Sequence, residues 1–395
     1  MSNDEWKMSS LRLMIVAGEA SGDAHGAALV RALRAVAPET PFEFFGATGA
    51  QMRRAGVVSV VDTDKLAILG LWEIARALPR FWQALRKLKQ AAGERKPAAV
   101  ILIDWPDFNL RLAKWLHRHS IRVIYYVSPQ LWAWRSYRAR NMRHDVDLLL
   151  SILPFEKDWY AARGITHVEY VGHPLAGEVH ADLEREEFCR LYDLDSAQPI
   201  ISFLPGSRRQ ELARILPAML NAAQIISNSR SDIQFVVVVA PNRDPDEARE
   251  IIARTKSLST LKNPLRVIHH QTRDALAASD AAAVASGTAT LEAALLGIPL
   301  VIVYKESFLN WHLLGSLIRA EHYGLVNLIA GRRVFVELMQ TELDGKRLSE
   351  ELMRLLEPEH NRALRIELKE VVRTIGQPGA SQRAAERVLE FLDIR

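Results

Sequence analysis

Short apolar runs recur along the chain, and most are followed by a small or polar turn and then by a helical pattern. Each run has the length and composition of a buried strand. In the first half the runs are Leu11–Ala17, Phe42–Phe45, Val57–Val61, Ala98–Ile103, Ile121–Val127 and Leu148–Leu153. In the second half they are Ile200–Leu204, Phe235–Ala240, Leu265–His269, Ala281–Ala285 and Pro299–Tyr304. Strand–helix alternation repeated in both halves predicts an α/β fold of two doubly wound, Rossmann-like domains with a cleft between them.

The charged segment Glu178–Asp195 separates the two series of strands. We therefore expect an N-terminal domain over residues 1–177, completed by the C-terminal helix at about 368–395. The second domain is expected over 178–367. A further helix is predicted at about 310–318.

The segment Ala281–Tyr304 predicts a strand, a tight turn, a helix from about Ala289 and a second strand. The turn consists of Ser286, Gly287 and Thr288. It directs the unpaired N–H groups of the helix and its positive dipole end above the strand, which is an anion-binding arrangement. Glu292 lies one turn further on and can reach ribose hydroxyls beside the anion. The alternative is an ordinary strand–turn–helix unit, with Ser286 or Thr288 as N-cap and Glu292 in solvent.

A similar turn follows the run Ile200–Leu204. Gly206 and Ser207 precede a helix, and Arg208 can pair with a phosphate through two N–H groups. A pair of solvated surface arginines is the alternative interpretation.

In the first half, candidate chemistry follows two of the predicted strands. A small-residue turn after Leu11–Ala17 contains Gly18, Glu19, Ser21, Gly22 and Asp23. Ser21 and Asp23 either cap the next helix or contact a ligand. Asp104 ends the strand Ala98–Ile103, where open α/β sheets bind ligands, and it is our candidate general base. Asp107 has an alternative task as N-cap of the helix Phe108–His119.

The segment Leu66–Gln90 predicts a basic amphipathic helix that Pro79 kinks or splits. Such a helix either lies in a membrane interface or covers its own core. The candidate interface residues are Leu71, Trp72, Ile74, Leu78, Phe81 and Trp82, and Trp132 and Trp134 add two indoles elsewhere.

Composition and motifs together argue against several classes of protein. The 395 residues are 49% hydrophobic and 25% charged, which is typical of a globular chain, and the formal net charge of +4 leaves the kind of anionic partner open. A single cysteine, Cys189, excludes a disulfide framework and a cysteine-based zinc site within the chain. No secretory signal and no long apolar run is visible, so we expect a cytoplasmic protein. No nucleic-acid-binding module is recognisable. The D-x-D pair Asp62 and Asp64 belongs to a spacing that recurs elsewhere, which favours chance over a metal site.

Eight segments in order across the chain together resemble one family, the lipid-A-disaccharide synthases, which are inverting glycosyltransferases with two Rossmann-like domains (GT-B type). The segments are Val16–Asp23, Ile103–Asn109, Tyr126–Arg135, Leu153–Lys157, Gly172–Pro174, Leu204–Arg208, Ser286–Glu292 and Asn327–Arg332. Trp105 departs from the family pattern, in which this position more usually looks like alanine.

The resemblance implies transfer of 2,3-diacylglucosamine from UDP-2,3-diacylglucosamine to 2,3-diacylglucosamine 1-phosphate. The products would be the β-1,6 disaccharide 1-phosphate and UDP, with no metal and no cofactor. It also implies that Asn327 and Gln271 complete a UDP pocket, and that Gly18–Asp23 lies against the reacting sugars. Because both substrates are acylated, it favours peripheral association with the inner face of the cytoplasmic membrane.

Two alternatives remain open from the sequence. One is another UDP-sugar enzyme of the same architecture, such as a UDP-N-acetylglucosamine 2-epimerase. The other is a non-catalytic basic protein that binds membrane or nucleic acid.

Overall fold

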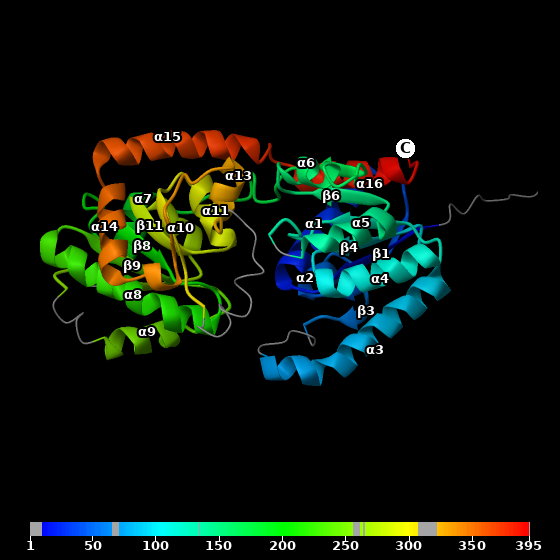
Figure 1. The fold of residues 1–395 in the computed structure, drawn as a ribbon, viewed down its shortest axis with the longest axis horizontal. Coiled ribbons are helices and arrows are strands. Elements are labelled where there is room, and N and C mark those ends of the chain that lie inside the picture. Colours follow the sequence, from blue (N-terminus) through cyan, green and yellow to red (C-terminus); the bar gives the residue numbers. More distant parts are fainter. Residues whose placement is uncertain are drawn as a thin grey trace, which may run out of the picture. The chain divides into compact units, whose positions relative to one another are not determined.

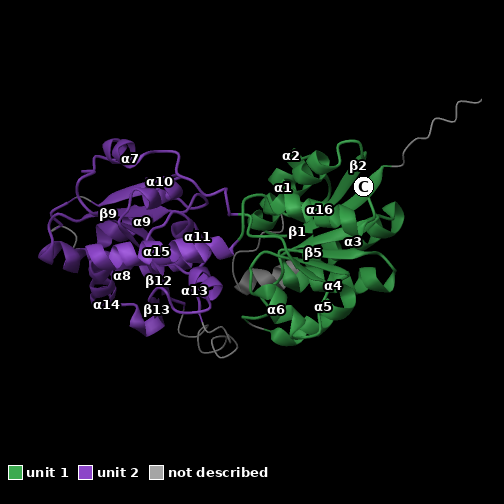
Figure 2. Cartoon of the chain, turned by 90° about the horizontal axis from the view of Figure 1, so that it is seen from above, with its two compact units in different colours: residues 1–174, 376–395 green, residues 175–375 purple. Residues whose placement is uncertain are grey.

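The computed structural model describes residues 10–64, 71–133, 135–255, 261–263, 265–306 and 322–394, and for residues 71–78 it describes the backbone alone. The chain divides into two compact units (Figure 2). Unit 1 is Met1–Pro174 with Gly376–Arg395, and unit 2 is Leu175–Ile375. The sequence placed these boundaries at 177 and 367. The helix predicted at about 310–318 lies outside the described residues.

Unit 1 is built on a seven-stranded parallel sheet with the order β3-β2-β1-β4-β5-β6-β7. Its strands are β1 (Leu11–Ala17), β2 (Phe42–Thr48), β3 (Val58–Asp62), β4 (Ala99–Ile103), β5 (Val123–Tyr126), β6 (Leu148–Ser151) and β7 (Val168–Tyr170). Its helices are α1 (Ala20–Val36), α2 (Ala50–Arg54), α3 (Leu71–Arg95), α4 (Pro106–Arg118), α5 (Ala139–Asp145), α6 (Glu156–Ala161) and α16 (Ala380–Phe391).

Helices cover both faces of this sheet because both faces are apolar. One face packs against α3, α4 and α5 through side chains such as Leu88, Leu112 and Met142. The other face packs against α1, α2 and α16 through Val30, Met52 and others, so two separate cores flank one sheet. Figure 1 shows the helices of unit 1 around this sheet. Fully buried strands explain why β4 and β5 read as continuous apolar runs in the sequence.

Unit 2 repeats the design with a six-stranded parallel sheet of order β10-β9-β8-β11-β12-β13. Its strands are β8 (Ile200–Leu204), β9 (Gln234–Val239), β10 (Arg266–His269), β11 (Ala281–Ala285), β12 (Leu300–Tyr304) and β13 (Glu337–Met339). Its helices are α7 (Arg185–Leu191), α8 (Arg209–Ser229), α9 (Pro245–Arg254), α10 (Thr272–Ala277), α11 (Thr288–Leu295), α13 (Leu325–Ala330), α14 (Gly345–Leu355) and α15 (Pro358–Thr374). The predicted fold class, two doubly wound α/β domains, is confirmed.

In each sheet the strand order reverses at one point, and ligands of open α/β sheets bind there. In unit 1 the reversal lies between β1 and β4, where Ala17 pairs with Ile103. Gly18 and Asp104 are therefore the next residues on neighbouring strands. In unit 2 it lies between β8 and β11, so the loops that begin at Pro205 and Ser286 leave the same edge of the sheet.

The last helix of the chain belongs to unit 1, although α15 before it belongs to unit 2. Arg383 of α16 donates to the Val171 carbonyl at 2.8 Å, and Arg387 pairs with Glu169 at 2.9 Å. These contacts fix α16 beside β7. Among the described helices, none combines the length and apolar character needed to cross a bilayer.

Candidate active site

Asp104 follows β4 directly and has left-handed backbone geometry, with φ of 46°. Trp105 follows with φ of 47°, and such φ values are uncommon for residues other than glycine. The turn is held by hydrogen bonds to the Asp104 carbonyl from the Asn109 amide at 2.7 Å and the Tyr125 hydroxyl at 2.5 Å. Backbone held in this region stores strain and is concentrated at functional sites. The turn places Asp104 between the end of β4 and the start of α4.

The pKa of Asp104 is raised to about 6, chiefly because the carboxyl is buried and secondly because Glu19 is negatively charged nearby. Burial disfavours the ionised form, and a neighbouring carboxylate adds to that effect. A carboxyl with this pKa is mostly ionised at pH 7 and binds a proton more strongly than an exposed aspartate, as a general base requires.

The first turn of α1 contains part of the predicted active-site loop. The helix begins at Ala20, so Ser21, Gly22 and Asp23 are helical rather than part of a flexible loop. Asp23 is buried and accepts from the backbone N–H groups of Gly49, Gln51 and Met52. Its carboxylate caps α2, so the alternative that Asp23 caps its own helix is wrong. Contact of Asp23 with substrate stays a prediction. Glu19 and Ser21 remain exposed beside the β1–β4 reversal.

Asp107 does not cap α4. Trp105 occupies the N-cap position without a side-chain hydrogen bond, and its indole stacks on Phe108 with ring centroids 4.0 Å apart. The Asp107 carboxylate instead accepts from Arg135 at 3.0 Å and Arg138 at 2.6 Å. This cluster ties the loop after β5 to the start of α4.

In unit 2, the turn before α11 has the geometry of the predicted anion site. Gly287 is the N-cap, with φ of 153° and open space where a side chain would lie. No side chain caps the helix, because the Ser286 hydroxyl donates to the Tyr323 carbonyl at 2.8 Å instead. The N-cap alternative for Ser286 or Thr288 is therefore wrong. The first turn of α11 presents N–H groups at the edge where ligands of such sheets bind.

Glu292, on the second turn of α11, is not simply solvated. Its carboxylate pairs with Arg273 at 3.3 Å, and its side chain is 20% exposed. Arg273 also donates to the Glu178 carbonyl at 2.7 Å. This ion pair fixes the orientation of the Glu292 carboxylate one turn after the α11 N-terminus.

The turn before α8 differs from that before α11, because a carboxylate of the protein binds its backbone N–H groups. Glu211 accepts from the backbone N–H groups of Ser207 at 3.1 Å and Arg208 at 3.2 Å. Gly206 has φ of 112°, and a Cβ on it would lie 2.4 Å from the Glu211 carboxylate. The backbone cradle predicted at Gly206–Arg208 is thus filled by a capping box. The Arg208 side chain, 77% exposed, is what this turn offers to a ligand.

Gln271 and Asn327 are both engaged within the protein. Gln271 is the N-cap residue of α10 and accepts from the Tyr192 hydroxyl. Asn327 is fully buried, donates to the Phe335 carbonyl and to Glu337, and accepts from the N–H groups of Val334 and Phe335. These partners hold the amide in place, and the place of Asn327 in a UDP pocket stays a prediction.

Comparison with known proteins decides the family. Residues 13–391 match the model of the family described as lipid-A-disaccharide synthetase. The lipid-A-disaccharide synthase of Solibacter usitatus is 42% identical over 384 residues, covering 97% of this chain and 98% of that protein. This chain belongs to the lipid-A-disaccharide synthetase family.

Solved structures with little sequence identity share the fold. S. aureus MnaA, in a co-structure with UDP, aligns with a TM-score of 0.66 at 13% identity, covering 97% of each chain. The calicheamicin glycosyltransferase CalG4 aligns with a TM-score of 0.61 at 15% identity, covering 98% of this chain and 99% of that one. These values establish a common two-domain architecture for this member of the family.

The D-x-D pair has a structural partner in this family member. Asp62 and Asp64 both pair with Arg53, at 3.1 Å and 2.6 Å. In the part of the chain that the structure describes, no group of three or more His, Cys, Asp or Glu side chains is placed to hold a metal ion.

Part of the predicted amphipathic helix covers its own core, and its membrane contact stays a prediction. In α3, Leu85 and Leu88 are buried in the core, so this part covers its own sheet. Trp82 is 54% exposed and Phe81 is half-buried against Phe108. The side chains of Leu71, Trp72, Ile74 and Leu78 lie outside the described residues, as does Trp134.

The contacts of two residues near the predicted site, Arg138 and Glu211, were not predicted from the sequence. Arg138 had no local signal, because its contact with Asp107 spans 31 positions. Glu211 did have one, since a glutamate three residues after an N-cap is the second half of a capping box.

Proposed function

We propose that this protein transfers 2,3-diacylglucosamine from UDP-2,3-diacylglucosamine to 2,3-diacylglucosamine 1-phosphate. The products are the β-1,6 disaccharide 1-phosphate and UDP, a step of lipid A synthesis. The observation that carries the proposal is the family match over residues 13–391. The raised pKa of Asp104 at the strand-order reversal of unit 1 supports it independently.

Asp104 acts as the general base in this proposal. Its carboxylate takes the proton from the acceptor 6-hydroxyl as that oxygen forms a bond to the donor anomeric carbon. Attack comes from the face opposite the leaving group, so the anomeric configuration inverts. The bond from the anomeric carbon to the diphosphate oxygen breaks, and UDP departs with the bonding electrons.

Unit 2 holds the donor in this proposal. The uncapped first turn of α11 binds the diphosphate, where fixed N–H groups stabilise the charge that develops on departing UDP. The exposed guanidinium of Arg208 adds a second positive group. Glu292, oriented by Arg273, accepts hydrogen bonds from the ribose hydroxyls.

An assay of UDP release tests the reaction. UDP is expected from UDP-2,3-diacylglucosamine only when the acylated acceptor is present, together with a tetraacyl disaccharide product. Unacylated UDP-N-acetylglucosamine is the matched control. Its conversion to the 2-epimer, with no acceptor-dependent UDP release from the acylated donor, would replace the transferase with an epimerase.

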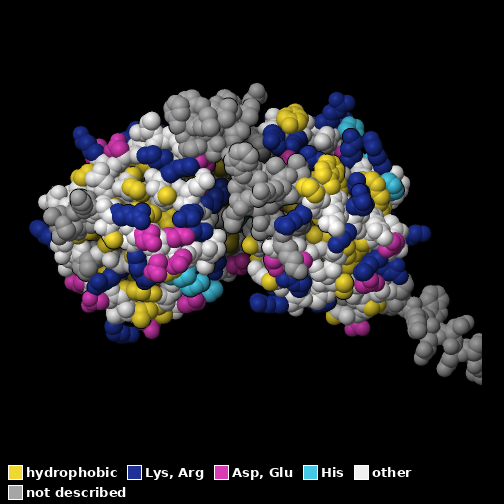
Figure 3. All heavy atoms as spheres, turned by 90° about the horizontal axis from the view of Figure 1, so that it is seen from below, with side chains coloured by type: hydrophobic (Ala, Val, Ile, Leu, Met, Phe, Trp, Pro, Cys, Tyr) yellow, Lys and Arg dark blue, Asp and Glu magenta, His cyan; other side chains and the backbone are white. Residues whose placement is uncertain are grey.

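We further propose that unit 1 binds the inner membrane surface through α3. Trp82 is the most exposed of the described candidate residues there, and Arg80, Arg86 and Lys87 are exposed near it. On the face of unit 1 seen in Figure 3, apolar and basic side chains lie side by side, as in segments that bind anionic bilayers.

Vesicle sedimentation tests the membrane proposal. Trp82→Gln should lower the fraction of protein bound to phosphatidylglycerol-containing vesicles while the unfolding curve stays the same. Ile366→Gln is the matched control, because Ile366 is an equally exposed apolar residue of unit 2. Equal binding of both variants and the wild type would remove α3 from the membrane surface.

A further inference from the structure

Two arginines converge on one carboxylate oxygen at the carboxyl edge of the unit 1 sheet. Arg135 and Arg138 both donate to Oδ1 of Asp107, at 3.0 Å and 2.6 Å. Arg138 is the more buried of the two, with 16% of its side chain exposed. Arg135 is 35% exposed and Asp107 is 48% exposed, so part of the cluster lies at the surface.

The charge of this cluster favours an anion. Two guanidinium groups and one carboxylate sum to +1, and the positive dipole end of α4 adds to it because Asp107 lies in the first turn of that helix. The shared oxygen of Asp107 accepts one N–H group from each arginine. Arginine pairs of this kind match the geometry of phosphate oxygens.

The backbone also indicates a site rather than a surface ion pair. Arg135 has left-handed geometry, with φ of 56°, directly before the 3-10 turn Ser136–Arg138. This conformation is unfavourable for a residue other than glycine and persists where surrounding contacts fix it. Here the fixing contact is Asp107.

The short distance between Asp107 and Asp104 indicates which part of a ligand the arginine cluster can bind. Asp104 and Asp107 are three residues apart, so their Cα atoms are separated by at most about 11 Å. A sugar whose 6-hydroxyl lies at Asp104 can therefore extend its opposite side, which carries the 1-substituent, toward Arg135 and Arg138.

We propose that Arg135 and Arg138, held by Asp107, bind the 1-phosphate of the acceptor and make the enzyme select a phosphorylated acceptor. This inference rests on the proposed function, since it names the part of the acceptor that the same site recognises. It assigns unit 1 a second task beside proton removal: it orients the acceptor so that the 6-hydroxyl faces Asp104.

The test compares two acceptors, 2,3-diacylglucosamine 1-phosphate and the same lipid without its phosphate. The wild type should use the phosphorylated acceptor with the higher kcat/KM. Arg135→Ala and Arg138→Ala should each lower kcat/KM for it by about 10–100-fold, the worth of one hydrogen bond to a charged group. The loss should lie mainly in KM, and kcat/KM for the dephosphorylated acceptor should stay the same.

Three controls make the result decisive. Arg118→Ala removes an exposed arginine at the other end of α4 and should leave both acceptors unaffected. Arg138→Lys should keep part of the preference. Binding of both arginine variants to phosphatidylglycerol vesicles should equal that of the wild type, because a lipid headgroup is the rival source of the phosphate.

Equal losses with both acceptors would assign the arginines a purely structural role and overturn the inference. The absence of a preference in the wild type, or a loss confined to vesicle binding, would also overturn it. A wild type that transfers to neither acceptor would instead contradict the proposed function. Direct binding of the phosphorylated and dephosphorylated lipids to the wild type and to Arg138→Ala would then decide the inference.

Discussion

A Cβ atom on Gly18 would lie 2.1 Å from Cδ2 of the Trp105 indole. The indole therefore occupies the space above the Gly18 backbone, between the end of β1 and the start of α4. It is held there by stacking on Phe108 and by an edge contact with Phe81 at 6.4 Å. Gly18 is needed for this close approach, and a bulky residue at 105 is accommodated because position 18 has no side chain.

Gly18→Ala should destabilise unit 1 by about 1–3 kcal/mol, the usual cost of overpacking. Trp105→Ala in the same chain should recover most of the loss, because the two groups compete for one volume. Gly93→Ala is the matched control: a Cβ there meets nothing within 4 Å, and alanine in a helix interior stabilises by about 0.5–1 kcal/mol. Urea unfolding measures all three, and an additive double variant would show that the two positions do not interact.

Asp104→Asn should keep UDP affinity and lose about 10²–10⁴-fold in turnover, the usual contribution of a positioned base. With a pKa of about 6, the wild-type rate should rise with pH through that value as Asp104 ionises. The raised pKa also means that folding opposes ionisation, so the wild type should lose up to about 3 kcal/mol of stability as pH rises from 4 to 7. Asp104→Asn should lack this loss. A pH–rate profile and urea unfolding at both pH values check the pair of effects.

Glu19→Gln should move the acidic limb of the pH–rate profile to lower pH. The negative charge of Glu19 raises the pKa of Asp104, so its removal leaves burial as the main cause of the shift. The shift of the midpoint to lower pH identifies this effect, because a role of Glu19 in substrate binding alone would change the maximal rate and not the midpoint. An unchanged midpoint would show that Glu19 does not raise the pKa of Asp104.

The sequence predicted the strands that carry the site because buried parallel strands form continuous apolar runs. β1, β4, β8 and β11 flank the two reversals of strand order, and all four were recognised within a residue of their bounds. Asp104 and the turn at Gly287 followed from where those strands end. β7 and β13 were missed, since each has only three residues and lies at a sheet edge.

Side-chain assignments based on neighbours in sequence were less reliable. Asp23 and Asp107 stand where a helix cap is expected, yet each pairs with groups more than twenty positions away. Local patterns contain no information about such partners, which the fold brings together. Asn327 shows the same limitation, since its place in a recognisable motif does not reveal that its amide is buried.

Arg208→Ala should cost about 2–4 kcal/mol in the transition state if its guanidinium faces the departing diphosphate. Arg209→Ala is the matched control, because that neighbour is also exposed and begins α8. Glu211→Gln, which retains an oxygen to accept from Ser207 and Arg208, should stay near the wild-type rate. Glu211→Ala removes the cap and should destabilise the protein by about 1 kcal/mol. Steady-state kinetics would remove Arg208 from the site if its variant matched that of Arg209.

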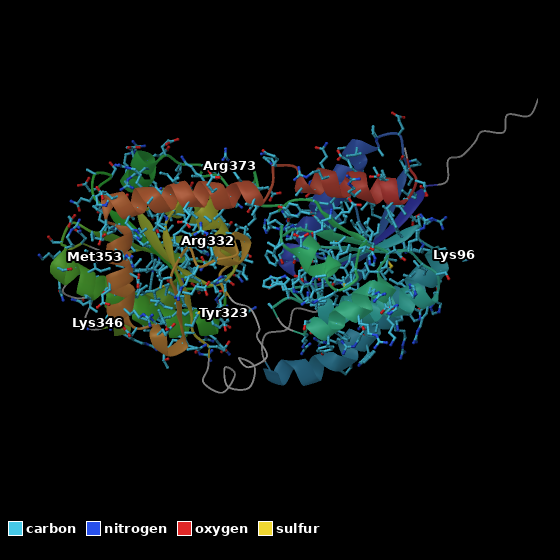
Figure 4. All side chains as sticks on the ribbon, turned by 45° about the horizontal axis from the view of Figure 1, so that its top comes forward. Lys96, Tyr323, Arg332, Lys346, Met353 and Arg373 are labelled. Atoms are coloured by element: carbon cyan, nitrogen blue, oxygen red, sulfur yellow. The ribbon has the colours of Figure 1, made fainter. Side chains whose placement is uncertain are left out.

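Asn327→Ala should act on stability rather than on UDP contact. Four hydrogen bonds of the buried amide would be lost, and Glu337 would keep its bonds from the N–H groups of Tyr323 and Gly324. Tyr323 and Arg332, labelled in Figure 4, flank the α13 helix that this network holds.

The expected loss for Asn327→Ala is about 2–5 kcal/mol, since buried donors and a carboxylate lose their partners. Asn228→Ala, an exposed position of α8, should change stability by less than about 0.5 kcal/mol. Under conditions in which the variant is still folded, Asn327→Ala should bind UDP with wild-type affinity. Gly287→Ala should instead lower UDP affinity. Alanine disfavours φ of 153°, so the first turn of α11 should shift away from the position that binds UDP. Calorimetric UDP titration of folded Asn327→Ala decides between the two roles, and a large drop in affinity at unchanged stability would identify Asn327 as a direct ligand.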